Sequence, residues 1–276
     1  MTISLIAADV PTGLFFEIVR AGRLLSWKKS VEFAKRIVPT HTTRNTICGD
    51  FMPDKPIPEW ERLLSSAAHL QKIVPGAVLV VGTAAATYAH HRISVDHDHV
   101  LTDLKERFDE ILSDLESVAG WQTARVRRPV LILGSLDGIE TGVRQLIRSE
   151  PLETTVIEAE GARLTVPTKG EMFRIKAVLA LKRNATRDYL DLAAMSAMLE
   201  DDGVREALST FDGYYPQPNG ASPLQQLANQ LANPLPYDLD ETDLSQYKHL
   251  DVQYQDWNHV RDICAHIAVA VIHQML

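Results

Sequence analysis

The chain has 276 residues, of which 45% are hydrophobic, and a formal net charge of −8 at pH 7. This length can bury a sizeable core, and the presence of only two cysteines excludes a disulfide framework. The negative net charge argues against bulk electrostatic attraction to nucleic acid. No apolar run approaches the roughly 20 residues of a membrane span, so a soluble, cytoplasmic protein without a membrane partner is predicted.

The charge is distributed unevenly. The acidic excess gathers after Asp201, whereas basic residues outnumber acidic ones between Gly120 and Leu190. The sequence therefore allows a local basic face on an acidic protein.

Three segments are predicted along the chain: an N-terminal helical lead-in over residues 1–56, a core over 57–200, and an acidic, mostly helical region over 201–276. In the first, Leu24 to Val38 has helix-forming composition. A proline-rich stretch then precedes a predicted helix from Glu59 to Ile73, whose apolar residues recur at helical spacing. Its Trp60 is predicted to be a core residue.

The stretch from Val78 to Val100 predicts a strand, a sharp turn, a short helix and a second strand. Gly82 would allow the turn because it has no Cβ atom, and Thr83 would begin the helix. The free amide groups and the positive dipole end of a helix start favour a phosphate group. This half of the stretch predicts a phosphate-binding turn.

Asp96 and Asp98 occupy the second strand of this stretch. Because alternate residues of a strand share a face, the two carboxylates would stand together, about 7 Å apart along the chain, and His97 and His99 would face the other way. Two carboxylates suit Mg²⁺, which completes its shell with water and substrate phosphates. The order of turn, helix and Asp-x-Asp predicts a nucleotide site with a metal ion.

This stretch resembles the first motif of the polymerase-β-like nucleotidyltransferase superfamily, and in detail that of the AbiEii/AbiGii-type nucleotidyltransferase toxins. The resembling positions are Val81-Gly82-Thr83, His91-Arg92, Ser94, Asp96 and Asp98. The family motif begins with two glycines, and Val81 replaces the first of them. The resemblance covers roughly Val78 to Ala194.

The residues after the predicted strand with Asp96 and Asp98 predict an amphipathic helix from about Thr102 to Val118 and a strand from Thr123 to Ser135. Gly138 to Leu146 is a further short apolar segment. Thr154 to Glu158 and Ala162 to Val166 predict a hairpin. Helices mixed with short strands and hairpins predict an α/β (α+β) fold with a mixed or antiparallel sheet, and the resemblance implies a polymerase-β-like nucleotidyltransferase core with helical flanking segments.

Enzymes of this superfamily usually carry a third carboxylate on a later strand. The candidates are Asp137, Glu140 and Glu158, and Glu140 is favoured. An exposed glutamate without a metal role is an equal alternative at that position.

A second signal runs from Lys169 to Met195. If one helix continues through Asn184, Lys176, Arg183, Arg187 and Asp191 lie within about 80° on one side of it. A solvated face with an Arg187–Asp191 pair is the alternative. The resemblance assigns Lys176, Arg183, Asp188 and Asp191 to the family's lysine, arginine and Asp-x-x-Asp, and implies that Lys176 balances triphosphate charge while Asp191 holds that lysine or acts as a base.

Four histidines near the motif, His90, His91, His97 and His99, favour core or supporting roles over zinc, because no cysteine or later histidine completes a ligand set. The dipeptide His97-Asp98 also occurs in HD phosphohydrolases, but the β-branched surroundings place it on a strand.

The final segment is predicted to contain a linker or partner-facing loop from Gly213 to Tyr247, interrupted by a short helix from Leu224 to Ala232. A helix from Trp257 to Met275 closes the chain, because its apolar residues recur at steps of four.

The resemblance implies transfer of a nucleotide from an NTP, with Mg²⁺ or Mn²⁺, to RNA at the tRNA 3′ end, by the toxin of a toxin-antitoxin pair that would bind an antitoxin protein. The residues expected to act catalytically are Asp96, Asp98, Lys176 and Asp191, with Asp96 and Asp98 holding the metal. Those expected to bind the nucleotide are Gly82, Thr83, Ser94 and Arg183. Two alternatives stay open: transfer to a small molecule, and a catalytically degenerate binding module of the same fold.

Overall fold

The computed structural model describes residues 58–275. The predicted lead-in over residues 1–56, with its helix from Leu24 to Val38, lies outside the described residues.

The described chain begins with helices and strands in alternation and ends with helices. The first elements are α2 (Pro58–Ile73), β1 (Val78–Val80), α3 (Val81–Ala89), β2 (His97–Leu101), α4 (Leu104–Ser117), β3 (Trp121–Arg127), β4 (Leu131–Leu136), β5 (Ile139–Gln145), β6 (Thr154–Ala159) and β7 (Ala162–Pro167). The helical part comprises α5 (Lys169–Arg183), α6 (Thr186–Ser196), α7 (Glu200–Leu208), α8 (Phe211–Tyr214), α9 (Pro223–Ala232), the 3-10 turns η1 (Leu239–Glu241), η2 (Leu244–Gln246) and η3 (Val252–Gln255), and α10 (Trp257–Met275).

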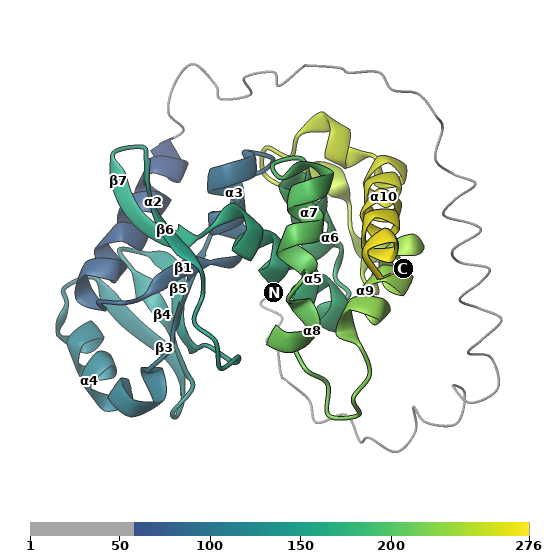
Figure 1. The fold of residues 1–276 in the computed structure, drawn as a ribbon. Coiled ribbons are helices and arrows are strands. Elements are labelled where there is room, and N and C mark those ends of the chain that lie inside the picture. Colours follow the sequence, from purple (N-terminus) through teal and green to yellow (C-terminus); the bar gives the residue numbers. More distant parts are fainter. Residues whose placement is uncertain (1–57, 276) are drawn as a thin grey trace.

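Figure 1 shows the sheet with α2 and α4 on one side of the molecule, the later helices on the other, and α3 between them. The main sheet has the strand order β1-β2-β5-β4-β3, in which β2 and β5 are parallel and the other pairs are antiparallel. Strands β6 and β7 form a separate hairpin. The predicted α/β (α+β) class, with a mixed sheet and helical flanks, is confirmed.

The two faces of the main sheet differ in chemistry. On one face, Leu101, Ile132 and Val143 are buried against apolar residues of α2 and α4, and this is the core face. On the other face lie Asp98 and its strand neighbour Gly142, and this is the Asp98 face. His97 and His99 alternate with Asp98 and are buried on the core face, as the sequence predicts.

The predicted single strand from Thr123 to Ser135 is wrong. The residues form a hairpin of β3 and β4, because Pro129 offers no backbone donor and interrupts the strand. The register of this hairpin slips by one residue at Ala124: Thr123 pairs with Gly134, and Arg125 pairs with Leu133.

This β-bulge changes which residues of β3 face which side. Trp121 and Thr123 pair with residues of the core face, whereas Arg125 and Arg127 pair with Leu133 and Leu131 and share their side of the sheet. Both arginines are exposed. The bulge therefore turns Arg125 and Arg127 onto the Asp98 face.

The segment from Lys169 to Met195 is not one continuous helix, so the condition for a single stripe is not met. Asn184 adopts left-handed backbone angles (φ 51°, ψ 37°) and ends α5, and Ala185 is extended before α6 begins. The Asp238 carboxylate accepts hydrogen bonds from the Thr186 amide at 2.7 Å and from its hydroxyl at 2.8 Å, so a distant residue caps the second helix. The stripe predicted along one helix is divided between two helices that pack together.

The remaining helices agree with the sequence. Helices α2, α4, α9 and α10 and the β6–β7 hairpin occur where periodicity predicts them. Trp60 is 7% exposed and belongs to the core. Leu227 and Leu231 of α9 and Val260 of α10 are buried in the same core as α5 and α6, so part of the predicted linker from Gly213 to Tyr247 is a packed helix.

Candidate active site

The turn between β1 and α3 occurs at Val81, one residue before the position that the sequence indicates. Val81 has φ 65°, a left-handed angle that L residues with a branched Cβ rarely adopt. Gly82 allows the loop that carries Arg92 and Ser94 to approach α3 closely. A Cβ added at Gly82 would lie 2.7 Å from Arg92 Nη2 and 3.2 Å from Ser94 Oγ. The glycine therefore lets the loop before β2 pack directly on the start of α3.

Two hydroxyl groups fix Asp96 at the end of that loop. Thr83 Oγ1 donates to the Asp96 carbonyl at 2.5 Å. Ser94 Oγ lies 2.9 Å from Asp96 Oδ1 and 3.2 Å from the Asp96 carbonyl. Asp96 itself is exposed. The loop thus presents a carboxylate whose backbone and one oxygen are already positioned.

Asp98 stands on the Asp98 face of β2 with a side chain that is 22% exposed. Burial raises the pKa of its carboxyl; the Arg144 charge opposes this and the nearby Asp96 charge adds to it, while Arg183 opposes it weakly. The Arg144 guanidinium Nη2 lies 3.4 Å from Asp98 Oδ1. Asp96 lies in the loop just before β2 rather than on the strand where the sequence predicts it. The two neighbouring carboxylates are still a donor set that a divalent cation would stabilise.

Glu140 lies on the Asp98 face of β5 by strand alternation, two residues before Gly142. It stands one residue before the paired part of β2 and β5 begins at His97 and Thr141. The Glu140 side chain is exposed. Asp137 instead lies in the β4–β5 turn, where Oδ2 is 3.4 Å from His69 Nδ1. Across residues 58–275, no group of three or more His, Cys, Asp or Glu side chains is arranged to hold a metal ion.

A buried carboxylate, Asp191, joins the loop to the helices. It accepts two hydrogen bonds from Arg92, from Nε to Oδ1 at 2.7 Å and from Nη2 to Oδ2 at 2.9 Å. His91 Nε2 lies 2.7 Å from Oδ1, and Lys176 Nζ lies 2.6 Å from Oδ2. Although burial favours the neutral acid, Arg92 and Lys176 hold the pKa of Asp191 well below its usual range. A permanently charged carboxylate with these partners holds the lysine and is a poor general base.

Lys176 does not reach the Asp98 face, whereas the resemblance implies a lysine that balances triphosphate charge. Its side chain is 1% exposed, and its ammonium group is enclosed between Asp191 and Asp188, whose Oδ1 lies 3.9 Å away. The break at Asn184 is the reason, because it folds α6 back onto α5. The cations that do act on Asp98 are Arg144 and Arg183.

Asp188 is buried without a hydrogen-bond partner for either carboxylate oxygen within the described part of the chain. Burial raises the pKa of its carboxyl, and the Lys176 and Arg183 charges oppose that shift. Asp188 therefore adds negative potential between the buried lysine and Arg183 through a long ion pair with Lys176, without a hydrogen bond to either within the described part of the chain.

His97 is a buried residue that hydrogen-bonds within the core. His97 Nε2 lies 3.0 Å from Ser66 Oγ, and Nδ1 lies 2.9 Å from Thr141 Oγ1. Because the Ser66 hydroxyl donates to the Leu136 carbonyl, it accepts from His97, which fixes the neutral tautomer protonated at Nε2. Burial lowers the pKa of His97 to about 4.

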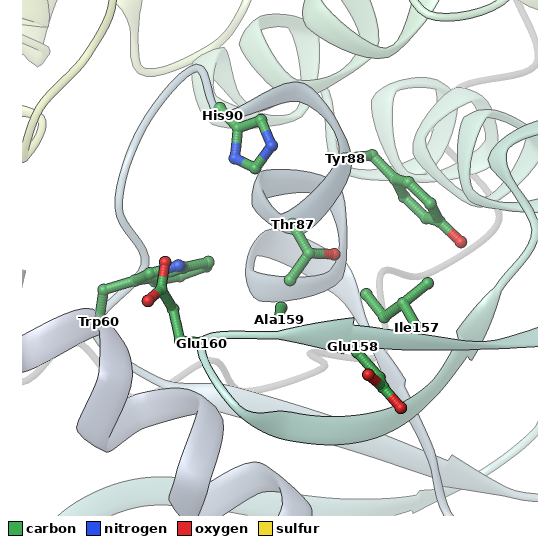
Figure 2. Close-up of a pocket in the computed structure, with 8 residues that line it drawn as sticks. All are labelled: Trp60, Thr87, Tyr88, His90, Ile157, Glu158, Ala159 and Glu160. Atoms are coloured by element: carbon green, nitrogen blue, oxygen red, sulfur yellow. The ribbon is translucent and has the colours of Figure 1, made fainter. Parts of the chain in front are cut away.

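A pocket of about 410 Å³ lies at the opposite end of α3 from Gly82 and Thr83. Figure 2 shows α3 over the β6–β7 hairpin, with Glu160 at the Trp60 end of the pocket and Tyr88 and Ile157 at the other. Glu158 lines this pocket and stands on the hairpin rather than in the main sheet. Of the three candidate carboxylates, Glu140 is therefore the one on the Asp98 face of the main sheet.

The comparisons with known proteins cover only parts of the chain or of its relatives. No family model matches. Over 130 residues the chain is 31% identical to "Mycolic acid-containing lipids exporter MmpL11" of Mycolicibacterium smegmatis and 34% identical to "Heme uptake protein MmpL11" of Mycobacterium tuberculosis. The match spans 46% of this chain and 13% of each relative. Among the described residues, no helix has the length and apolar character needed to cross a membrane.

Two solved structures are similar in part. A candidate nucleotidyltransferase from H. pylori has a TM-score of 0.48 and 13% identity, covering 78% of this chain and 96% of its own. An antigenic nucleotidyltransferase-like protein from Paracoccidioides brasiliensis has a TM-score of 0.39 and 13% identity, covering 57% and 89%.

Sequence reasoning missed two residues of the site, Arg144 and Gly142. Both follow Glu140 at steps of two on β5, so the alternation of that strand was the signal that could have found them. What the sequence lacks is the parallel pairing of β5 with β2, which brings these residues beside Asp98.

Proposed function

We propose that the protein is a metal-dependent nucleotidyltransferase that moves a nucleotide from an NTP to an RNA acceptor. The observation that carries the proposal is the closeness of Asp98, on β2, to Asp96, at the end of the preceding loop, where the hydroxyls of Thr83 and Ser94 fix Asp96. The acceptor at the tRNA 3′ end, and the role as toxin of a pair with an antitoxin protein, rest on the family resemblance.

In this reaction the acceptor hydroxyl oxygen bonds to the α-phosphorus of the NTP. The bond from that phosphorus to the oxygen bridging the β-phosphate breaks, pyrophosphate leaves, and the hydroxyl proton passes to solvent. Asp96 and Asp98 would hold Mg²⁺ or Mn²⁺, with Glu140 on the Asp98 face of β5, and the bound ion supplies positive charge at the phosphates.

The chain's own residues prepare the site. Ser94 and Thr83 fix Asp96, Gly82 admits the loop, and Lys176 with Asp191 anchors Arg92 in the packing against Gly82. The first-turn amides of α3 have no side-chain cap from Val80, the residue before the helix, so they suit a phosphate oxygen. Lys176 and Asp191 are thus proposed as positioning residues rather than groups that touch the substrate.

Arginine side chains on the Asp98 face support RNA as the acceptor. Arg144 on β5 and Arg125 and Arg127 on β3 share that face with the carboxylates. Leu131 and Leu133 lie between them and are half-buried. A row of cations leading away from a metal site can bind several phosphates of one strand, although the protein as a whole is acidic.

The test is to incubate the protein with each labelled NTP, a divalent cation and total RNA, and to follow label into RNA. Label that enters RNA with wild-type protein and not with Asp96→Asn supports the proposal. Pyrophosphate release that requires a small-molecule acceptor, with unlabelled RNA, would establish the small-molecule alternative. If the protein neither transfers label nor binds NTP, the alternative of a binding module with the same fold is favoured.

A further inference from the structure

A charged contact on the Asp98 face occupies the position that a metal ion would need. The Arg144 Nη2 atom lies 3.4 Å from Asp98 Oδ1, at the long end of the hydrogen-bond range. Arg144 pairs with Val100 of β2, which is two residues after Asp98. The side chains of Arg144 and Asp98 therefore lie on the same face of adjacent strands.

The two partners differ in freedom. Asp98 is 22% exposed, whereas the Arg144 side chain is 43% exposed and is held by this one ion pair among the described residues. A long, half-exposed side chain in a loose contact can change partner without disturbing the core. Arg183 also acts on both Asp98 and Arg144, so cationic charge is concentrated there before any metal ion binds.

Gly142 keeps the space in which this contact forms. A Cβ at that position would lie 2.5 Å from Leu133 Cδ2 and 3.0 Å from Asp98 Oδ1. The Asp98 carboxylate therefore rests over bare backbone on the neighbouring strand, with Arg144 beyond it.

We propose that Arg144 is an exchangeable counter-ion: it pairs with Asp98 in the free protein and moves to the phosphates of the nucleotide when a divalent cation and an NTP bind. This inference rests on the proposed function. A guanidinium group and a divalent cation next to the same carboxylate repel each other, so the cation favours departure of the arginine. The planar fork of the guanidinium then matches two phosphate oxygens.

The exchange predicts opposite effects on two affinities. Arg144→Ala removes a competitor of the cation, so Mn²⁺ alone should bind severalfold more tightly than to the wild type. The same variant lacks a phosphate contact, so Mn²⁺ with a non-hydrolysable NTP analogue should bind about tenfold more weakly. Arg144→Lys retains the charge without the fork, and should bind Mn²⁺ alone as the wild type does while binding the analogue with intermediate affinity.

The measurement is calorimetric titration of the full chain with Mn²⁺, without and with the analogue. Arg163→Ala is the control, because it removes an exposed arginine from β7, outside the main sheet. Affinities that both fall or both stay unchanged in Arg144→Ala would overturn the exchange, as would the same pattern in Arg163→Ala. If the wild type binds Mn²⁺ but never the analogue, the proposed function fails and the exchange with it; if wild-type protein binds both, the inference stands or falls on Arg144 alone.

Discussion

Arg127 and Arg128 are adjacent in sequence and serve opposite faces of the sheet. Arg127 pairs in register with Leu131 and lies on the Asp98 face. Arg128 forms an ion pair with Asp109 of α4 and lies 5.0 Å from the centre of the Phe108 ring, on the core-face side. Only Arg127 therefore faces the carboxylates.

This pair gives a matched test of the acceptor. Arg127→Glu should reduce labelling of RNA strongly and weaken RNA binding, with a shallower dependence on salt than the wild type shows, because a phosphate contact is lost. Arg128→Glu changes the net charge equally and should have a much smaller effect. Equal losses in the two variants, measured by RNA binding across a salt series, would show that only overall charge matters.

The carboxylate pair should be required for transfer and dispensable for folding. In Asp96→Asn and Asp98→Asn the side-chain volume is nearly kept while the charge that a metal ion needs is lost. We expect label transfer to fall below detection, and thermal unfolding to show Asp98→Asn as stable as the wild type or slightly more stable, because burial and the Asp96 charge already disfavour its ionised form. Undiminished transfer by both variants would exclude the metal-pair mechanism.

The ion pair between Lys176 and Asp191 should dominate stability around the site. Lys176→Ala removes one partner of a fully buried pair with an N–O distance of 2.6 Å, and we expect a loss of about 3–5 kcal/mol in the free energy of unfolding. Lys176→Met keeps more of the apolar stem and should lose less. Urea denaturation measures both, and an unchanged midpoint in Lys176→Ala would contradict the anchoring role.

Gly142→Ala should displace Asp98 through overpacking. The added methyl group meets Leu133 Cδ2 at 2.5 Å, so we expect roughly 1–3 kcal/mol of destabilisation and weaker binding of Mn²⁺. A second change, Leu133→Ala, opens the space and should restore cation binding in the double variant. If the double variant binds Mn²⁺ no better than Gly142→Ala, closeness to Leu133 is not the reason for a glycine there.

Buried neutral histidines should make the protein sensitive to acid. Burial lowers the pKa of His97 to about 4 and that of His99 well below the ordinary 6.5, so the unfolded chain binds more protons at intermediate pH. The stability that these neutral rings contribute is complete above about pH 6.5 and is lost as the pH falls toward 4; for His97 this is roughly 3 kcal/mol. Asp98, whose pKa is raised, opposes the trend.

The measurement is unfolding in urea between pH 8 and 4.5. His99→Leu should reduce the slope with pH and raise stability near neutrality by about 1 kcal/mol, because both ring nitrogens of His99 are buried without partners within the described part of the chain. His273→Gln, at an exposed position, serves as the control. A wild-type slope in His99→Leu would mean that its ring does not titrate on unfolding.

Local patterns predicted what depends on local chemistry. The opposed faces of Asp98 and His97 follow from strand alternation, and helices such as α4 and α10 follow from periodicity, because neighbours in sequence decide both. Asn184 ends α5 because its left-handed backbone is sustained from elsewhere: Tyr237 N donates to the Asn184 carbonyl at 3.0 Å, and Asp238 caps α6. Contacts over such separations leave no periodic signal, so the division of Lys176 and Asp191 between two helices could not be predicted.

The same limit applies to Arg144. The sequence shows that this arginine lies in a short apolar segment. Its place beside Asp98 comes from the parallel pairing of β2 with β5, which joins segments separated by α4 and a hairpin. The same pairing brings the strand that carries Glu140 beside β2. In both cases the sequence pattern identifies the residue but not its neighbours across the sheet.

The bulge at Ala124 means that the electrical character of the Asp98 face is set by counting residues along β3 as much as by which residues are present. If the same residues continued the regular ladder from Thr123, Arg125 would pair with Ile132, and both arginines would turn to the core face. Deleting Ala124 would remove the extra residue and leave Arg125 opposite Leu133, so the arginines would keep their face. Residues separated by an even number of positions in β3, such as Trp121 and Arg127, therefore lie on opposite faces of the sheet.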